Sequence, residues 1–233
     1  MEGPPCQSWS EIGNRQGIKD ERGKLFLEYI RIIKDKSPLF FLAENVGGIL
    51  YKNMKESFIK IAKSFEKIGY NVEYKLTNSK DYGVPQERKR VFIIGYKKAT
   101  GKKFNFNNLK KSKQKTLKDT IFDLRHNVKP YPETNHFIQN HEYYKSRFSP
   151  IFMSRNRRKN WDQQSFTIQA NARHVLLHPD SSKMVKKENT EIRVFENKNY
   201  RRLSVRECAR IQTFPDNFEF IYKQIMAIKW WAM

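Results

Sequence analysis

The chain has 233 residues, and its 46 Lys and Arg against 24 Asp and Glu give a formal charge of +22 at pH 7. An excess of this size destabilises a compact protein unless a polyanion is its partner, so DNA or RNA is the expected partner. The two cysteines stand far apart and no apolar run could span a bilayer, which excludes a disulfide framework and a membrane protein. We predict a reduced, soluble, cytoplasmic protein and, because no Cys or His spacing fits zinc, no metal.

The first predicted elements are a helix and a buried strand. Residues 23–36 have the apolar spacing of a helix, and one face carries Leu25, Phe26, Tyr29, Ile32 and Ile33. The apolar run 39–43 that follows is typical of a strand buried on both faces.

A second helix is expected over 54–68, ending at Gly69, and further strands are expected over 72–76 and 91–96. This alternation over residues 1–97 predicts an α/β fold, a partial catalytic domain with a Rossmann-like parallel sheet. A parallel sheet that begins here would have an unpaired edge and an uncovered apolar face. Further strands are therefore expected on its N-terminal side.

The second half of the chain has a different pattern. Residues 98–118 form a basic, irregular connection, and residues 98–200 as a whole predict a small mixed lobe because turn signals interrupt its short elements. A helix is expected over 203–214, with Ser204 as its N-cap and Glu207 three residues further on.

Three short motifs carry residues suited to chemistry. Cys6 lies between a Pro-Pro corner and a polar run, where a thiol has little to pack against. Glu44-Asn45-Val46 directly follows the predicted buried strand, and Gln86-Glu87-Arg88-Lys89-Arg90 leads into the strand at 91–96. Taken singly, each has an ordinary alternative, namely an exposed thiol, a helix or turn cap, and an exposed strand start.

In order and approximate spacing, the three motifs resemble those of the DNA (cytosine-5)-methyltransferases, and the resemblance extends from about residue 3 to residue 225. It implies methyl transfer to C5 of a cytosine in a short duplex site, within a restriction-modification system. In such a reaction the cytosine is flipped out of the duplex and a thiolate adds to its C6, which makes C5 nucleophilic. Cys6 fits the role of that thiolate.

The same resemblance assigns roles to further residues that would surround the flipped cytosine. Glu44 would supply a proton or strong hydrogen bond to N3 of the base, with the pKa of its carboxyl raised by an apolar pocket. Arg90 would stabilise negative charge on O2, supported by Arg88 and Gln86. Gln86 is also expected to contact the DNA. The residues expected to approach DNA from the loop after the nucleophile are Gln7, Ser8 and Ser10.

The segments IFMSRNRRKNW and FTIQANARHVLLHP resemble the branch of the family that modifies GGCC. Arginine reads guanine by a bidentate contact to O6 and N7 in the major groove. Arg155, Arg157 and Arg173 occupy the matching positions, whereas Arg158 is better suited to a phosphate. A generic basic surface is the alternative. Cys208 is expected to be a small buried apolar residue.

The sequence also departs from the family pattern. The family's methyl donor is S-adenosylmethionine, held by an F-x-G-x-G turn that this chain lacks. Pro5 and Leu25 match positions at the rim of the donor site, so an incomplete donor pocket is expected. Residues 201–225 resemble the helix that returns to the catalytic domain, but the closing G-Y-K-x-x-G-N-A-V-P element is absent. Residues 226–233 are therefore expected to be a frameshifted tail.

These features predict a DNA (cytosine-5-)-methyltransferase truncated at both ends. Two alternatives within the same family remain open. One is an inactive DNA-binding remnant, and the other is one subunit of a split enzyme whose second polypeptide carries the missing N-terminal half. An unrelated RNA-binding protein would need aromatic stacking motifs, and the sequence contains none that we recognise.

Overall fold

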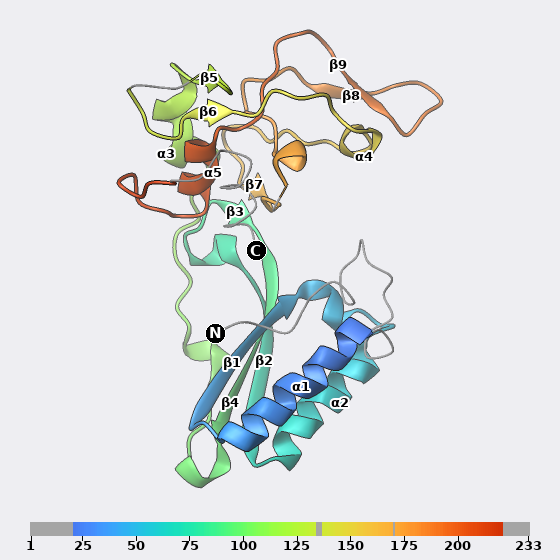
Figure 1. Cartoon of the computed structure of the whole chain (residues 1–233), viewed down its shortest axis with the longest axis vertical. Coiled ribbons are helices and arrows are strands. Elements are labelled where there is room, and N and C mark those ends of the chain that lie inside the picture. The colour runs from blue at the N-terminus through green and yellow to red at the C-terminus, as the bar shows by residue number, and fades with distance from the viewer. Residues whose placement is uncertain (1–20, 134–136, 170, 221–233) are drawn as a thin grey trace. The chain divides into compact units, whose positions relative to one another are not determined.

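The computed structural model describes residues 21–133, 137–169 and 171–220, whose helices and strands are shown in Figure 1. The chain forms two compact units. Within the described residues, the first unit consists of 21–78 and 89–111, and the second consists of 79–88 and the residues from 112 onward. This division differs from the predicted boundary at residue 97, and it groups residues 201–220 with the lobe.

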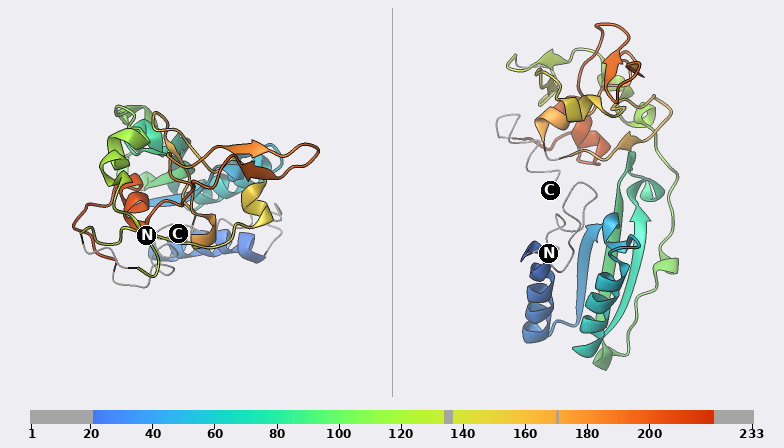
Figure 2. Two further views of the ribbon diagram at one scale, coloured as in Figure 1. Left: turned by 90° about the horizontal axis from the view of Figure 1, so that it is seen from above. Right: turned by 90° about the vertical axis from the view of Figure 1, so that its right-hand side faces the viewer.

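The first unit is a three-stranded sheet with two helices on one face. Its elements are α1 (Glu21–Lys36), β1 (Phe40–Val46), α2 (Lys55–Lys67), β2 (Tyr70–Asn78) and β4 (Lys89–Lys97). The two helices lie side by side (Figures 1 and 2), and Phe26 of α1 packs edge-on against Phe65 of α2. The second predicted helix and the two strands after it are confirmed, and Gly69 has the positive φ that ends α2.

The strands of this sheet are ordered β1-β4-β2. β1 and β2 run in the same direction and are joined through α2, as expected for an α/β fold. β4 lies between them and is antiparallel to both, so the α/β class is confirmed but the prediction of a parallel sheet is wrong for these strands. The reason is the connection from β2 to β4, which has no crossover helix of the kind that a parallel neighbour requires.

The buried face of α1 differs from the predicted one. Phe26, Ile30 and Ile33 are buried, but Leu25 and Ile32 are 44% and 48% exposed. Residues 25 and 32 are two turns apart and share one stripe of the helix, which the described residues leave uncovered. The prediction that all five apolar residues face the core is therefore wrong for these two.

β1 is buried on one face only. Phe41 and Ala43 are buried in the core with the helices, whereas Phe40 on the opposite face is exposed. Phe41 packs over Gly95 of β4, where an added Cβ would come within 2.1 Å of its ring. The prediction of a strand buried on both faces is therefore wrong, and Glu44 lies on the open face with Phe40.

The second unit is a small mixed lobe, as predicted. Its described residues form three α-helices, α3 (Leu117–Ile121), α4 (Pro150–Met153) and α5 (Val205–Ile211). They also form three two-stranded sheets, which are β3 (Gln86–Glu87) with β7 (Ser165–Phe166), β5 (Lys129–Pro130) with β6 (Glu142–Tyr143), and β8 (Met184–Lys186) with β9 (Arg193–Phe195). The main core cluster of this unit joins α3 and α5. The basic connection before α3 is irregular apart from short 3-10 turns, as expected.

α5 is shorter than the helix predicted over 203–214, but its N-cap is the predicted one. The Ser204 hydroxyl accepts a hydrogen bond from Glu207 N, and the Glu207 carboxylate accepts one from Ser204 N, which makes a capping box.

Cys208 is fully buried, and burial raises the pKa of its thiol far above the ordinary value. This confirms that Cys208 is an unreactive, apolar part of the core.

None of the helices in the described part of the chain is long and apolar enough to cross a membrane. In the same residues, no group of His, Cys, Asp and Glu side chains is arranged to hold a metal ion.

Candidate functional site

Two residues predicted to act on the base meet on the open face of the first sheet. Glu44 of β1 stands opposite Phe92 of β4 in register, and Arg90 is two residues before Phe92. The two side chains form an ion pair with 2.5 Å between Arg90 Nε and Glu44 Oε1. Arg90 also donates from Nη1 to the carbonyl of Lys89 at 2.8 Å. Strand pairing therefore brings together two residues that are far apart in sequence.

The described residues do not enclose the Glu44 carboxylate. Its side chain is 41% exposed, whereas that of Arg90 is 19% exposed. Two half-buried apolar residues, Leu42 and Phe92, flank it on the same face of the sheet. The described residues therefore do not form the apolar pocket predicted around Glu44. Leu42 and Phe92 would line only one side of such a pocket.

The two supporting residues, Gln86 and Arg88, belong to the second unit. Ser79 closes the loop that carries them, because its hydroxyl donates to Gln86 O at 2.6 Å and accepts from Arg88 N at 3.2 Å. Gln86 is 1% exposed, and its Nε2 is buried with no partner among the described residues. This burial suits a supporting role better than a direct contact with DNA.

Glu87 anchors the same loop to the lobe. Its carboxylate accepts hydrogen bonds from Lys80 Nζ at 3.0 Å and from Lys159 Nζ at 3.3 Å, and its carbonyl accepts one from Thr167 Oγ1 at 2.7 Å. Lys159 directly follows the arginine-rich segment 155–158. The loop of the third motif and the predicted base-reading segment are therefore connected, a link that the sequence pattern did not indicate.

Several predicted residues lie outside the described part of the chain. They are Pro5, Cys6, Gln7, Ser8 and Ser10, together with residues 226–233. Leu25, the second residue assigned to the methyl donor, is described and lies exposed on α1.

The segments that carry the predicted base-reading arginines lie side by side in the second unit. Leu177 N donates to Arg157 O at 3.0 Å, and Leu203 N donates to Leu176 O at 2.8 Å. Residues 155–158 and 173–178 are thereby held against residues 201–203. The fold brings Arg155, Arg157 and Arg173 into one neighbourhood.

The arginines in this neighbourhood differ in what they contact. The side chains of Arg155 and Arg173 are exposed and have no partner among the described residues. Arg157 donates from Nε to Phe152 O and from Nη2 to Ile151 O, both at 3.3 Å, and burial together with the charge of Arg155 lowers its pKa.

Arg158, the predicted phosphate contact, is also engaged within the lobe. It donates from Nε to Pro179 O at 2.9 Å and from Nη1 to Asn160 Oδ1 at 2.8 Å. Two of the four arginines therefore make internal hydrogen bonds, which the clustering of arginines in the sequence could not reveal.

His174 is a polar residue of this neighbourhood that the sequence analysis missed. Its Nδ1 lies 3.2 Å from Gln169 Oε1, and the residue directly follows Arg173. Burial lowers the pKa of His174, and the charges of Arg157 and Arg202 lower it further, so the ring is neutral at neutral pH. The polar run QANARH was the only available signal, because it places Gln169 and His174 around Arg173.

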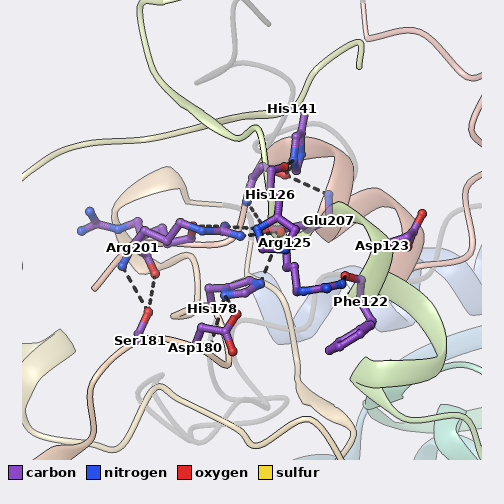
Figure 3. A network of polar contacts seen from close by, with 12 residues as sticks. Phe122, Asp123, Arg125, His126, His141, His178, Asp180, Ser181, Arg201 and Glu207 are labelled. Atoms are coloured by element: carbon purple, nitrogen blue, oxygen red, sulfur yellow. Dashed lines mark hydrogen bonds and ion pairs between the residues drawn. The ribbon is translucent and has the colours of Figure 1, made fainter. Parts of the chain in front are cut away.

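A buried polar network, shown in Figure 3, holds α5 to the rest of the lobe. The fully buried Glu207 carboxylate accepts hydrogen bonds from Arg201 Nη1 and Nη2, both at 2.8 Å, and one from Ser204 N at 2.8 Å. Burial alone would raise the pKa of Glu207. The hydrogen bonds and charge of Arg201, with a contribution from His178, bring it below the ordinary value, so the carboxylate is charged.

His178 is the titratable partner of this carboxylate. Asp180 N donates to His178 Nδ1 at 3.2 Å, so the neutral ring carries its proton on Nε2, which faces Glu207 Oε1 at 3.5 Å. That distance is too long for a good hydrogen bond. Burial lowers the pKa of His178 to about 4, the charge of Arg201 adds to this effect, and the Glu207 carboxylate opposes it.

We expect the free energy of unfolding to decrease as the pH falls from about 6.5 towards 4. In this window the unfolded chain protonates His178 and the folded protein does not, so acid favours unfolding, by up to about 3 kcal/mol. The measurement is the urea midpoint at pH 7.5, 6.5 and 5.5. His178→Asn keeps an acceptor for Asp180 N and does not titrate, so its profile should be flatter. An equally steep profile for this variant would contradict the assignment.

Comparisons with known proteins agree with the motifs. A family model described as C-5 cytosine-specific DNA methylase matches residues 1–232. The Type II methyltransferase M.MthTI of Methanothermobacter thermautotrophicus is 51% identical over 232 residues, which cover 96% of this chain and 69% of that protein. The Type II methyltransferase M.FnuDI of Fusobacterium nucleatum is 49% identical over 233 residues, covering 96% of this chain and 68% of that protein.

The solved structures that resemble this chain have the same fold. A putative DNA modification methyltransferase encoded within an E. coli prophage matches with a TM-score of 0.65 and 20% identity, covering 97% of this chain and 71% of that one. An Entamoeba histolytica methyltransferase matches with a TM-score of 0.60 and 17% identity, covering 97% and 69%. At these identities the likeness concerns the fold alone.

Proposed function

Because this chain belongs to the C-5 cytosine-specific DNA methylase family, we propose that it acts in methylation of cytosine C5 in a short duplex site, as part of a Type II restriction-modification system. The observation that carries this conclusion is the family match over residues 1–232, together with relatives at 51% and 49% identity. The same match disfavours an unrelated RNA-binding protein. Double-stranded DNA is the proposed partner, and the cytoplasm is the proposed location.

The contact between Glu44 and Arg90 supports their proposed roles. N3 and O2 are adjacent atoms on one edge of cytosine, so a proton donor and a guanidinium that touch each other can engage both atoms together. Glu44 would serve N3, and Arg90 would serve O2 as negative charge develops there. The thiolate of Cys6 would add to C6 of the same base.

The methyl donor implied by the family is S-adenosylmethionine. Of the residues assigned to it, Leu25 is described, and it offers one exposed apolar side chain. A ligand pocket buries most of its ligand's surface, so a single exposed side chain does not make one. The described residues do not fit the donor by themselves, and the roles proposed for this chain concern the cytosine and the DNA.

The outer edge of β1 is the place where donor-binding strands would add. β1 is an edge strand among the described strands, and Phe40 beside that edge is exposed. An open strand edge next to an apolar face is a surface on which another strand can pair. We assign a second polypeptide with an F-x-G-x-G motif to this edge. A DNA-binding remnant, the alternative, would gain no activity when such a polypeptide is supplied.

GGCC is the proposed recognition sequence. Arg155 and Arg173 are exposed and lie in one neighbourhood, which supports their pairing with successive guanines. Arg157 is also assigned to a guanine, but it must first give up its hydrogen bonds to the carbonyls of Phe152 and Ile151. Arg158 would act through the backbone of the DNA.

We expect Arg155→Ala and Arg173→Ala each to reduce discrimination at one base pair by about 1–3 kcal/mol. Each change removes a bidentate contact to guanine while leaving the phosphate contacts in place. The measurement is the ratio of Kd values for GGCC duplexes and singly substituted duplexes at fixed salt, on the chain alone.

Lys113→Ala is the matched control, because Lys113 is exposed in the basic connection. It should weaken binding to all duplexes alike and reduce the slope of log K against log salt by about 1. Equal losses on GGCC and random duplexes for Arg155→Ala, Arg157→Ala and Arg173→Ala would show that the three arginines contact phosphates only.

A further inference from the structure

The most unusual charged residue of the lobe is Arg202, which is 2% exposed and has no carboxylate partner among the described residues. Its guanidinium donates instead to three backbone carbonyls. Nη1 donates to Tyr144 O at 3.1 Å and to Ser146 O at 3.0 Å, and Nη2 donates to Arg173 O at 3.3 Å. The last of these carbonyls belongs to a predicted base-reading residue.

Aromatic rings surround the same guanidinium. Arg202 Cζ lies 4.1 Å from the ring centre of Phe148 and 5.6 Å from that of Phe152. Phe152 is fully buried, and Arg157 lies over its ring at 5.3 Å and donates to its carbonyl. Arg202 and Arg157 thus share one aromatic ring. Burial lowers the pKa of Arg202 to about 10, so the group remains charged at neutral pH.

We propose that Arg202 is a positioning residue of the DNA-reading surface. It fixes the backbone of Arg173 and the aromatic ring beneath Arg157, so that both guanidinium groups are aligned to contact bases. The inference rests on the proposed reading of GGCC by these arginines. It assigns a role to Arg202, which itself is buried and does not touch DNA.

The chemistry of the site explains why an arginine is needed there. A hydrocarbon side chain could fill the same volume, but it could not hold carbonyls from two separate segments at once. Lysine keeps the charge, yet it is a point donor without the planar fork that reaches several oxygens in fixed directions. A loosened Arg173 backbone would leave its side chain free to reach phosphates while losing the alignment that a bidentate base contact requires.

The lobe contains a matched control. Arg206 is also 2% exposed and also donates to carbonyls, including Gln139 O at 3.0 Å and Phe218 O at 3.0 Å. None of its carbonyl partners belongs to the segments that carry the predicted base-reading arginines. Loss of Arg206 should therefore destabilise the lobe without changing how bases are read.

The experiment compares the wild-type chain with Arg202→Met, Arg202→Lys and Arg206→Met. For each, the thermal midpoint is measured together with the ratio of Kd values for GGCC and singly substituted duplexes at fixed salt. We expect Arg202→Met to lose about tenfold in discrimination at the base pair that Arg173→Ala affects, which corresponds to about 1.4 kcal/mol. Arg206→Met should lower the midpoint and keep the wild-type discrimination.

A double-mutant cycle separates positioning from general loss of stability. Because Arg202 acts through Arg173, the double variant Arg202→Met/Arg173→Ala should lose no more discrimination at that base pair than Arg173→Ala alone. Additive losses would overturn the inference. If Arg202→Met does not fold, the test rests on Arg202→Lys, which should also lose discrimination because lysine lacks the planar fork of donors. Wild-type discrimination in Arg202→Lys would show that the fork is not required, and would overturn the inference.

The outcomes also separate this inference from the proposed function. If Arg173→Ala reduces discrimination but neither Arg202 variant does, the inference fails while GGCC reading stands. If Arg155→Ala, Arg157→Ala and Arg173→Ala all leave discrimination unchanged, the proposed reading itself fails, and the role of Arg202 fails with it.

Discussion

Replacement of Glu44 by Gln is expected to slow the exchange of the C5 hydrogen of the target cytosine with solvent by about 10²–10⁴-fold. In this exchange the Cys6 thiolate adds to C6, and the electron pair of the C5–C6 double bond takes a proton from solvent at C5. Loss of the original C5 proton and departure of the thiolate then restore cytosine. No methyl donor takes part, so the reaction reports on the base-activating residues alone. It is measured as tritium released from duplex DNA labelled at C5.

The size of the effect follows from the proton that glutamine lacks. Thiolate addition places negative charge on the N3 and O2 edge of the ring, and only a carboxyl group at position 44 can deliver a proton to N3. Gln has nearly the same volume as Glu and keeps an oxygen for Arg90 Nε, which pairs with Glu44 in the structure. DNA binding should therefore be retained while exchange is lost.

Two further variants make this test decisive. Glu73→Gln is the matched control, because Glu73 lies on the same face of the sheet, opposite Ile94 in register, and away from the ion pair. Its exchange rate should equal that of the wild type. Cys6→Ser should abolish exchange, since a serine hydroxyl is not ionised at neutral pH. Exchange that survives in Cys6→Ser would refute the nucleophile. Wild-type binding without any exchange would favour the DNA-binding remnant.

Local signals in the sequence predicted local structure well. The spacing of Ser204 and Glu207 indicates a capping box within four residues, and the structure has it. Gly69 likewise marks the end of α2, because a residue there must adopt a positive φ. Such features depend on neighbours along the chain, and the sequence contains those neighbours.

Non-local arrangements could not be predicted in the same way. The direction of β4 depends on how the loop of residues 79–88 folds back, and apolar content alone does not distinguish a parallel strand from an antiparallel one. Apolar content alone also does not show whether β1 is covered on one face or on both, because that depends on which elements pack against its second face. The pairing of Glu44 with Arg90 is a consequence of that strand register, and the family resemblance indicated only that both residues act on the same base.

The arginines show most clearly what could not be predicted from the sequence, namely which groups each side chain binds. The charge excess pointed to nucleic acid, and the exposed Arg155 and Arg173 fit that interpretation. Several other arginines instead bind oxygens inside the lobe, namely Arg157, Arg158, Arg201, Arg202, Arg206 and Arg210. A guanidinium binds a carbonyl, a carboxylate or a guanine edge by the same forked donors. The sequence therefore shows the donors and cannot show which oxygen they meet.

Glu207→Gln is expected to reduce the free energy of unfolding of the lobe by about 3–5 kcal/mol. The carboxylate is fully buried, and it accepts two hydrogen bonds from Arg201 and one from Ser204 N. Gln keeps the size but removes the charge, and its amide can place an N–H group against the donors of Arg201. The largely buried guanidinium of Arg201 would then lack its counter-charge. The measurement is the urea unfolding curve at pH 7.

Glu191→Gln provides the control for this loss, because Glu191 pairs with Lys186 in solvent, where an ion pair contributes little to stability. A combined Arg201→Leu/Glu207→Leu variant tests the mechanism, since removing both charges leaves no unpaired ion. It should be less destabilised than Glu207→Gln in spite of the lost cap on Ser204 N. The opposite order of stability would contradict this explanation. If the double variant is less stable than Glu207→Gln, the ion pair itself stabilises the lobe, and the effect of Glu207→Gln does not come from an unpaired buried charge on Arg201.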